Sequence, residues 1–429
     1  MTASAPGAPP GSGTRRPDPE RWPDVAEVPR CGRARAALAQ SFVRRAVARL
    51  PLCVTLPDGR TWGRGGPRLE LRDPVAFHRR IAVDGLIGFG ESYQAGEWEA
   101  PDLVAVLTVL AAEVRTLVPQ PLQRLRGMYV RRRPAAQRNT TRGARDNIHR
   151  HYDLSNDLFA SFLDPGMSYS AAVFRTLPAN PSHLWAAQQR KVDRLLDLAG
   201  VGPGSRLLEI GTGWGELALR AAERGAEVVT ITLSEEQRRY AQRRVAEADP
   251  PGRVDVLLRD YREVTGHYDA IVSVEMIEAV GAEFWPEFLR VLDRRLAPDG
   301  RVALQAITMP HDRMLATRDT YTWIQKYVFP GGMLPSEEAV ARISAERTSL
   351  RLTRSDGFGP HYAETLRLWR ERFTARTRHV RRLGFDETFQ RMWTFYLGYS
   401  EAGFRSGYLD VRQLLLEKPP LQEGGESST

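Results

Sequence analysis

The sequence predicts an α/β fold in which a mostly parallel sheet carries helices on both faces, with a smaller domain in front of it. Two observations support this prediction. From about residue 145 onward, short apolar runs alternate with longer amphipathic runs, which is the pattern of successive strand and helix units. A turn that contains three glycines, Gly211, Gly213 and Gly215, directly follows the first of these apolar runs.

The first part of the chain is expected to form a disordered tail and then an α+β domain. Residues 1–29 are rich in Ala, Pro and Gly and lack the apolar run of a signal peptide, so they are predicted to be the tail. Residues 30–118 are predicted to form the N-terminal domain. Its expected elements are a helix at Ser41–Leu50, short strands at Cys53–Leu56 and Arg68–Leu71 around the turn Pro57-Asp58-Gly59, and an amphipathic helix at Asp102–Thr116.

A basic linker is predicted at residues 119–144. The wider stretch 115–145 contains nine arginines and no Asp or Glu, within a chain of net charge +9. Arginine clusters with apolar neighbours bind anionic phosphate surfaces, either lipid headgroups or nucleic acid. The alternative is a solvated face without a partner, which is the more usual role of a run of like charges.

Residues 145–415 are predicted to form the larger domain, followed by a disordered tail at 416–429. Strands are expected at 206–210, 227–233, 253–258, 268–274 and 300–307, and helices at 182–199, 214–224, 234–247 and 283–296. Residues 310–380 are long enough to form a helical cover over a site. In a sheet of this kind the ligand binds at the carboxyl ends of the strands.

The glycine turn, Gly211–Gly215, indicates a nucleoside site. A strand, a turn without Cβ atoms and a helix let backbone N–H groups approach a ligand closely. The pattern is E-x-G-x-G-x-G from Glu209, whereas a dinucleotide site has G-x-G-x-x-G and an acidic residue about 20 residues further on. The second strand ends in Thr230, Thr232 and Ser234, with no acid at its tip. The pattern therefore favours S-adenosylmethionine over NAD.

Eight segments between residues 151 and 373 carry a family resemblance. They are, in order, HYDLSNDLF, MSYSAAVF, IGTGWGELA, ITLSEEQ, RDYRE, VSVEMIEAVG, KYVFPGGMLPS and HYAETLRLWRERF. With them the chain resembles the cyclopropane-fatty-acyl-phospholipid synthases and their relatives, which include the mycolic acid cyclopropane synthases and the methyltransferases that make 10-methyl fatty acids. The resemblance extends over about residues 75–410.

The resemblance implies a Rossmann-like, class I S-adenosylmethionine-dependent methyltransferase. Its substrate would be the cis double bond of unsaturated fatty acyl chains in phospholipids. The product would be a cyclopropane or a methylene fatty acid, and a partner reductase would be needed to convert a methylene product into a 10-methyl one.

The resemblance also implies the residues that bind the cofactor. They are Tyr169, Ser170, Glu209, Gly211, Gly213, Thr232, Leu233, Gln237, Asp260, Tyr261 and Arg262. Other roles are open for three of them. Tyr169 and Tyr261 could be ordinary core aromatics, and Asp260 could be a turn cap.

A base must remove a proton after the methyl group is added. In the family a bound bicarbonate ion often serves, held by a cysteine loop, a glutamate, a histidine and a tyrosine. Glu278 and Tyr362 stand at two of these places, but Ala171 replaces the cysteine and Gln305 replaces the histidine. Gln305 can still hydrogen-bond an anion, so the replacements leave bicarbonate binding open.

The sequence offers several carboxylates as a substitute base. Asp146 precedes the HYDL segment, although its alternative role is a helix N-cap. Glu275 and Glu278 are further candidates, and on one helix their spacing would put them on nearly the same face. His149 and His151 are weaker candidates. No metal site is predicted.

Composition points to the cytoplasm. Cys31 and Cys53 are the only cysteines, too few for a disulfide framework, and the longest apolar stretch, Leu103–Ala112, is half of what a bilayer span needs. The expected location is the inner face of the membrane, with peripheral attachment to a phospholipid surface. The oligomeric state is open, and a homo-oligomer is compatible with the sequence.

Three other functions compete with this interpretation. A methyltransferase of another small lipid or of a polyketide could use the same fold. A non-catalytic lipid-binding relative would explain the lost cysteine and histidine, but the retained glycine turn, Gln237, Asp260, Glu278 and Tyr362 argue against it. A nucleic-acid methyltransferase would fit the basic surface, but no target-base motif of the N-P-P-Y type is present, so nucleic acid is not expected as a partner.

Overall fold

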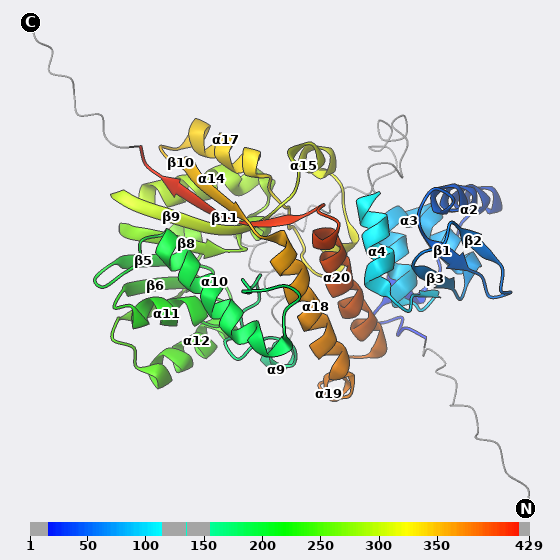
Figure 1. The fold of residues 1–429 in the computed structure, drawn as a ribbon, viewed down its shortest axis with the longest axis horizontal. Helices are drawn as coiled ribbons and strands as arrows, with labels where there is room; N and C mark the ends of the chain where they lie inside the picture. The colour runs from blue at the N-terminus through cyan, green and yellow to red at the C-terminus, as the bar shows by residue number, and fades with distance from the viewer. Residues whose placement is uncertain (1–15, 114–133, 135–154, 420–429) are drawn as a thin grey trace, which may run out of the picture. The chain divides into compact units, whose positions relative to one another are not determined.

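The structure is a computed structural model that describes residues 16–113, 134 and 155–419. The chain divides into two compact units, and most of their elements are labelled in Figure 1. The first unit comprises Met1–Pro101 and Gly384–Phe395, and the second comprises Asp102–Leu383 and Tyr396–Thr429.

The first unit contains a four-stranded sheet with the strand order β2-β1-β3-β4. The strands are β1 (Cys53–Thr55), β2 (Thr61–Gly63), β3 (Arg68–Leu71) and β4 (Trp98–Glu99). β1 runs antiparallel to β2 and parallel to β3. The turn at Pro57-Asp58-Gly59 therefore joins β1 to β2, a three-residue strand that was not predicted, and β3 follows later.

Three helices complete the N-terminal part of this unit. They are α1 (Pro23–Ala26), α2 (Arg33–Val47) and α3 (Pro74–Gln94). α2 begins eight residues earlier than the predicted helix at Ser41, because the preceding segment RARAALAQ consists of strong helix formers. Asp73 caps α3 by accepting hydrogen bonds from the backbone of Val75 and Ala76, and Gly85 interrupts the helix with φ 56°.

Arg80 ties α1 to the rest of the first unit. Its buried guanidinium donates to the carbonyls of Asp24 (2.7 Å) and Val25 (2.6 Å) and to Oε1 of Glu97 (2.7 Å). Burial raises the pKa of the Glu97 carboxyl to about 7. The side chain of Val25 is 1% exposed. The prediction of a disordered tail up to residue 29 is therefore wrong for this segment, because buried contacts far along the chain hold it.

An aromatic cluster closes the other side of the unit. Trp98 stacks on Phe89 with ring centroids 4.8 Å apart and lies 5.0 Å from Tyr93. Phe395, from the start of helix α20 (Glu387–Arg405), lies 5.3 Å from Tyr93. Arg391 of the same helix bonds Glu99 at 2.6 Å. The unit is thus completed by residues from near the end of the chain.

The second unit is built on a seven-stranded sheet with the order β10-β11-β9-β8-β5-β6-β7. Its strands are β5 (Arg206–Ile210), β6 (Glu227–Thr232), β7 (Val254–Leu258), β8 (Tyr268–Val274), β9 (Leu296–Thr308), β10 (Arg351–Gly357) and β11 (Asp410–Glu417). β5 to β9 are mutually parallel, whereas β11 pairs antiparallel with β9 and β10. The five predicted strands are all present, with small shifts at their ends.

β10 and β11 were not predicted. β10, with the sequence RLTRSDG, lies at the sheet edge and is mostly polar, so no apolar alternation marks it. It falls inside the stretch 310–380 that was expected to form a helical cover over the site. β11 runs to Glu417, so the first two residues of the predicted tail 416–429 belong to the sheet.

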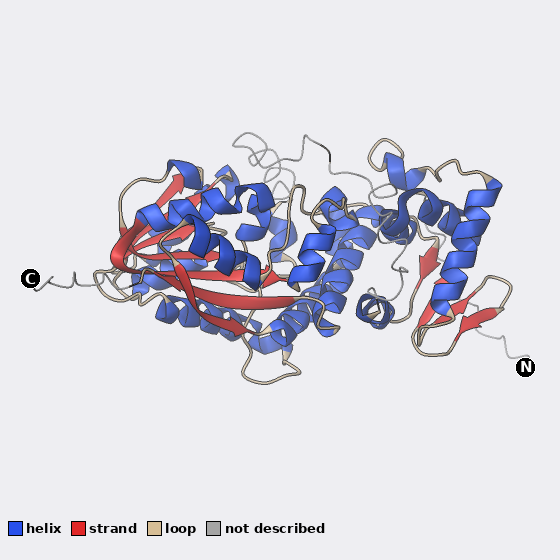
Figure 2. Ribbon diagram, turned by 90° about the horizontal axis from the view of Figure 1, so that it is seen from above, coloured by secondary structure: helices blue, strands red, loops and turns tan. Residues whose placement is uncertain are grey.

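Helices cover both faces of this sheet (Figure 2). The α-helices of the second unit are α4 (Leu103–Ala112), α9 (Asn156–Ala160), α10 (Leu184–Leu198), α11 (Glu216–Glu223), α12 (Glu235–Ala248), α13 (Ile277–Val280), α14 (Trp285–Arg295), α15 (His311–Thr317), α16 (Trp323–Tyr327), α17 (Glu337–Arg347), α18 (Gly359–Ala375), α19 (Thr377–Arg382) and the rest of α20. Short 3₁₀ turns lie at η2 (Pro181–His183), η3 (Tyr261–Glu263) and η4 (Ala282–Phe284). Across 16–113 and 155–419, none of the helices has the length and apolar character needed to cross a bilayer.

Alternate residues of the central strands enter two separate cores. Leu207 of β5 packs with Leu195 of α10 and Ala218 of α11, whereas the next residue, Leu208, packs with Phe288 and Leu292 of α14. This alternation follows from the two-residue period of a strand. It fixes the sheet between two helical layers, so the strand ends that carry the glycine turn are held firmly.

Candidate active site

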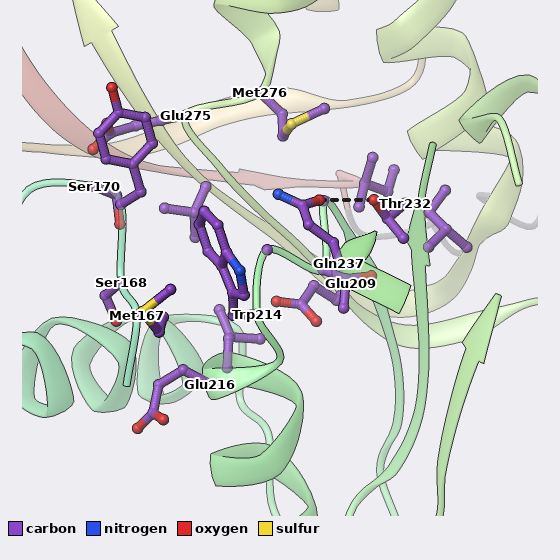
Figure 3. Close-up of a pocket in the computed structure, with 18 of the residues that line it drawn as sticks. Met167, Ser168, Ser170, Glu209, Trp214, Glu216, Thr232, Gln237, Glu275 and Met276 are labelled. Carbon is purple, nitrogen blue, oxygen red and sulfur yellow. Dashed lines mark hydrogen bonds between the residues drawn. The ribbon is translucent and has the colours of Figure 1, made fainter. Parts of the chain in front are cut away.

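A pocket opens at the carboxyl ends of β5, β6 and β8 and encloses about 990 Å³, including its open mouth (Figure 3). Most of the predicted cofactor residues line it. They are Tyr169, Ser170, Glu209, Gly211, Gly213, Thr232, Leu233, Gln237 and Tyr261. Asp260 and Arg262 are not among its lining residues.

The glycine turn forms the floor of the pocket. Gly211, Gly213 and Gly215 have φ values of 102°, 52° and 90°, which L-residues with side chains rarely adopt. A Cβ atom on Gly211 would lie 2.6 Å from Cγ of Met276, whereas one on Gly213 would meet no atom of the described chain within 4 Å. The chain at Gly213 therefore borders open space, where backbone can approach a ligand.

The end of β6 supplies polar groups without an acid. The Thr232 hydroxyl donates to Oε1 of Gln237 at 2.9 Å, and both residues are buried. Ser234 caps α12 by accepting a hydrogen bond from the backbone N–H of Gln237. The Gln237 amide nitrogen is turned away from Thr232 (Figure 3), so its N–H groups can serve the hydroxyls of a ribose.

A buried cation lies at the opposite wall. Lys191 of α10 is 3% exposed and donates from Nζ to Oγ of Ser170 at 2.8 Å. Burial lowers the pKa of its ammonium group, and the carboxylates of Glu275, Asp164 and others oppose that shift. A lysine and a serine at one wall suit a carboxylate, and a hydrogen-bonding amide at the other suits a ribose. The pocket therefore fits S-adenosylmethionine, which has both.

Tyr261 reaches the pocket, while its neighbours act behind it. Asp260 accepts a hydrogen bond from the backbone of Arg262 at 3.0 Å and forms an ion pair with its guanidinium at 3.1 Å. The Arg262 guanidinium lies 4.8 Å from the Tyr261 ring centroid. Asp260 thus has the geometry of a turn cap, the alternative considered for it, and the cofactor contacts expected of Asp260 and Arg262 stay predictions.

Glu275 is the centre of a second polar cluster. Its Oε1 accepts hydrogen bonds from the backbone N–H of Ala171 (2.9 Å) and from Nε2 of Gln305 (2.8 Å). Its Oε2 accepts from the hydroxyl of Tyr362 (2.6 Å). Two of the predicted catalytic residues, Tyr362 and Gln305, therefore meet at a carboxylate, and that carboxylate belongs to Glu275.

Glu278 lies outside this cluster. Its Oε1 accepts a hydrogen bond from the backbone N–H of Ile307, and its Oε2 has no partner among the described residues. It does not line the pocket. Glu275 precedes α13 with φ 52°, so the two glutamates do not share one helix face. The expectation that Glu278 meets Tyr362 and Gln305 is not supported by this geometry.

Some candidates cannot be placed. Asp146, His149 and His151 lie outside the described residues, as does nearly all of the stretch 115–145.

Sequence reasoning missed some of the residues that line the pocket. Glu275 was only an alternative base, although it directly follows β8 and strand ends are where such sheets bind ligands. Lys191 was not singled out, although it interrupts the apolar stripe of α10. Trp214 also lines the pocket and donates from Nε1 to Oδ1 of Asn156 at 2.9 Å.

Comparisons with known proteins identify the family of this chain. A family model described as mycolic acid cyclopropane synthetase matches residues 139–414. The chain belongs to the mycolic acid cyclopropane synthetase family. The tuberculostearic acid methyltransferase UfaA1 of Mycobacterium tuberculosis strain H37Rv is 55% identical over 414 residues, which cover 94% of this chain and 97% of that protein.

Other members of the mycolic acid cyclopropane synthetase family match less of the chain. The cyclopropane-fatty-acyl-phospholipid synthase of Escherichia coli strain K12 is 34% identical over 80% of this chain and 86% of its own length. The solved structure of the cyclopropane synthase MmaA2 from Mycobacterium tuberculosis has a TM-score of 0.59 at 34% identity, and covers 64% of this chain and 98% of that one.

One solved member of the family was determined with a cofactor product. The mycolic acid cyclopropane synthase CmaA1, complexed with SAH and CTAB, has a TM-score of 0.59 at 33% identity and covers 67% of this chain and 99% of that one. The comparisons confirm the predicted family and fold class, and S-adenosylmethionine as the cofactor. The chain described here is therefore an S-adenosylmethionine-dependent methyltransferase.

Two buried carboxyls near the site should make stability depend on pH. Burial raises the pKa of both Glu209 and Glu278 to about 8, from about 4.5 in an unfolded chain. Below about pH 4.5 both carboxyls are protonated in the folded and in the unfolded protein, so they do not lower the free energy of unfolding. As pH rises toward 8, only the unfolded chain releases them, so the free energy of unfolding should fall. Glu278→Gln should make that fall shallower in urea titrations, whereas Glu247→Gln, on the exposed end of α12, should not.

Proposed function

We propose that this methyltransferase adds a methyl group to the cis double bond of an unsaturated fatty acyl chain in a phospholipid, and that its product is a methylene fatty acid, the precursor of a 10-methyl one. The observation that carries the proposal is the 55% identity, over nearly the whole length of both chains, to a protein named for tuberculostearic acid, a 10-methyl fatty acid. The alternative product is a cyclopropane, for which relatives of about 34% identity are named.

Two groups of residues have separate roles at this site: residues that line the pocket would hold the cofactor, and the polar cluster around Glu275 would face the reacting chain. When bound, S-adenosylmethionine supplies an electrophilic methyl group. Gln237 and Thr232 would hold its ribose, and Ser170 with Lys191 would hold its carboxylate. Gln305 and Tyr362 are buried and Glu275 between them is half-buried, so a cationic acyl chain beside this cluster would be kept from water.

The product can be tested directly. The purified protein is incubated with vesicles of dioleoyl phosphatidylglycerol and methyl-labelled S-adenosylmethionine, and the fatty acids are then analysed by mass spectrometry. The expected product is labelled and one CH₂ heavier than oleate, and ozonolysis should cleave its exocyclic methylene. A labelled product that survives ozonolysis would indicate a cyclopropane. No labelled acyl chain in any lipid would contradict the proposal and favour another small substrate.

The exposed side of helix α2 supports the proposal that the protein acts at a membrane. Residues 28–57 contain six arginines and no Asp or Glu. On α2, within this stretch, Leu38 and Phe42 are 70% and 38% exposed, and with Arg45 they follow the spacing of one helix face. An exposed apolar pair beside arginines is the pattern of a helix that lies on an anionic lipid surface. We propose that this α2 surface binds the phospholipid bilayer that contains the substrate.

Two sets of variants should separate the contributions to membrane binding. Arg45→Gln with Arg49→Gln should weaken binding to anionic vesicles by about tenfold or more and reduce its salt dependence, since each arginine near such a surface contributes about 1 kcal/mol. Leu38→Ser with Phe42→Ser should weaken binding at all salt concentrations.

Arg64→Gln with Arg68→Gln, exposed in the same unit, is the matched control for charge. Co-sedimentation with anionic vesicles measures the binding of all three double variants. If the control variant loses as much vesicle binding as the α2 variants, the α2 surface has no special role.

A further inference from the structure

Glu275 has an unusual backbone conformation. It directly follows β8, and its φ of 52° lies in the left-handed region, which costs a residue with a Cβ about 1 kcal/mol or more. Its backbone N–H donates to the carbonyl of Gln305 at 2.7 Å. Strain of this kind persists where surrounding contacts hold it, and it is most often found at functional sites.

The carboxylate of Glu275 has three donors and one open position. Two donors are on Oε1, and the Tyr362 hydroxyl is on Oε2. Because each carboxylate oxygen accepts about two hydrogen bonds, Oε1 is filled, while Oε2 retains a lone pair. That lone pair is where a proton can be accepted.

The donor group of Gln305 is oriented by a neighbouring strand. Its Oε1 accepts a hydrogen bond from Nε2 of Gln413 at 3.1 Å, and these residues are direct partners across β9 and β11. With its oxygen engaged, Gln305 presents its NH₂ group to Glu275. The amide therefore stabilises a carboxylate at this place, as a donor, and does not compete for its proton.

Glu275 also has access to the pocket. It lines the same cavity as the glycine turn, whereas Glu278 does not. Burial raises the pKa of the Glu275 carboxyl, and its three hydrogen bonds act in the opposite direction. A carboxylate with these properties is a stronger base than one in water.

We infer that Glu275 is the general base of the reaction and that its carboxylate fills the position where a free anion would otherwise be held. The inference rests on the proposed function. After methyl transfer the acyl chain is cationic, and one of its C–H protons passes to Oε2 of Glu275, which becomes a neutral carboxylic acid. The electron pair of that C–H bond forms the C=C bond of the methylene group, after a hydride shift, or closes a cyclopropane ring.

The first test compares variants of Glu275 in buffers with and without carbonate. The parent protein should be equally active in both. Glu275→Gln should lose about 100-fold or more in kcat, while its affinity for S-adenosylmethionine, measured by calorimetry, stays within about threefold. Glu247→Gln, an exposed carboxylate far along α12, is the matched control and should resemble the parent.

The second test asks whether an anion can replace the side chain. Glu275→Gly removes the carboxylate and suits the left-handed φ, so the donors at Ala171, Gln305 and Tyr362 are left facing a gap. ¹³C-labelled bicarbonate should bind this variant and not the parent, as seen by NMR line broadening, and should restore part of its activity.

Three results would overturn the inference: stimulation of the parent by bicarbonate, Glu275→Gln activity within tenfold of the parent, or no bicarbonate binding to Glu275→Gly. The NMR result does not depend on activity. A parent protein that methylates no acyl chain would instead contradict the proposed function.

Discussion

Gly213→Val is expected to fold and to lose about 100-fold or more of its affinity for S-adenosylmethionine, because its side chain would occupy the space that backbone and cofactor share. An added Cβ at Gly213 meets no described atom within 4 Å, so the protein itself is not crowded. The left-handed φ of 52° should cost about 1–2 kcal/mol, a fraction of the stability of a typical domain.

Gly202→Val is the matched control for this variant. Gly202 also has open space around a new Cβ, but it lies in the loop before β5 and does not line the pocket. Calorimetry measures cofactor affinity, and circular dichroism checks that both variants are folded. Unchanged affinity in a folded Gly213→Val protein would show that the cofactor binds elsewhere.

Arg80→Met should destabilise the first unit by about 3–5 kcal/mol, since it leaves the buried Glu97 carboxylate without its cation. The variant also removes the donors to the carbonyls of Asp24 and Val25, so α1 should become accessible to protease. Because Glu97 can accept a proton, lowering the pH from 8 to about 5 should recover part of the lost stability.

Arg79→Met is the control for Arg80→Met, because Arg79 is the exposed neighbour on the same helix. Urea unfolding at the two pH values gives the free energies of unfolding. A loss below about 1 kcal/mol, in the range of exposed ion pairs, would mean that the buried pair contributes little to the unit.

The sequence predicted the parallel part of the sheet because burial leaves a direct mark on it. β5 and β8 are short apolar runs separated by helices of regular period, and the glycine turn marks the edge that binds the ligand. β10 has no such mark, since an exposed edge strand needs no apolar face. α1 could not be predicted either, because its order depends on Arg80, more than fifty residues away.

The candidate site shows the same division. The glycine turn could be predicted because its role follows from its place at a strand end and its backbone shape, whereas Gln237 was expected from the family resemblance. Spacing in the segment VSVEMIEAVG could not tell whether Glu275 or Glu278 faces Tyr362. That choice depends on the left-handed φ of Glu275, which turns the chain before α13 begins.

The first unit has a consequence for the order of events during synthesis. Phe395 of its aromatic cluster and Arg391, which bonds strand β4, belong to the segment Gly384–Phe395, whereas the rest of the unit precedes residue 102. On the ribosome, the N-terminal segment must therefore wait until nearly all of the 429 residues have been translated before its core can close. A nascent chain of this protein exposes Trp98 and Tyr93 throughout that interval, so chaperone binding is expected at the beginning of the chain and not at its end.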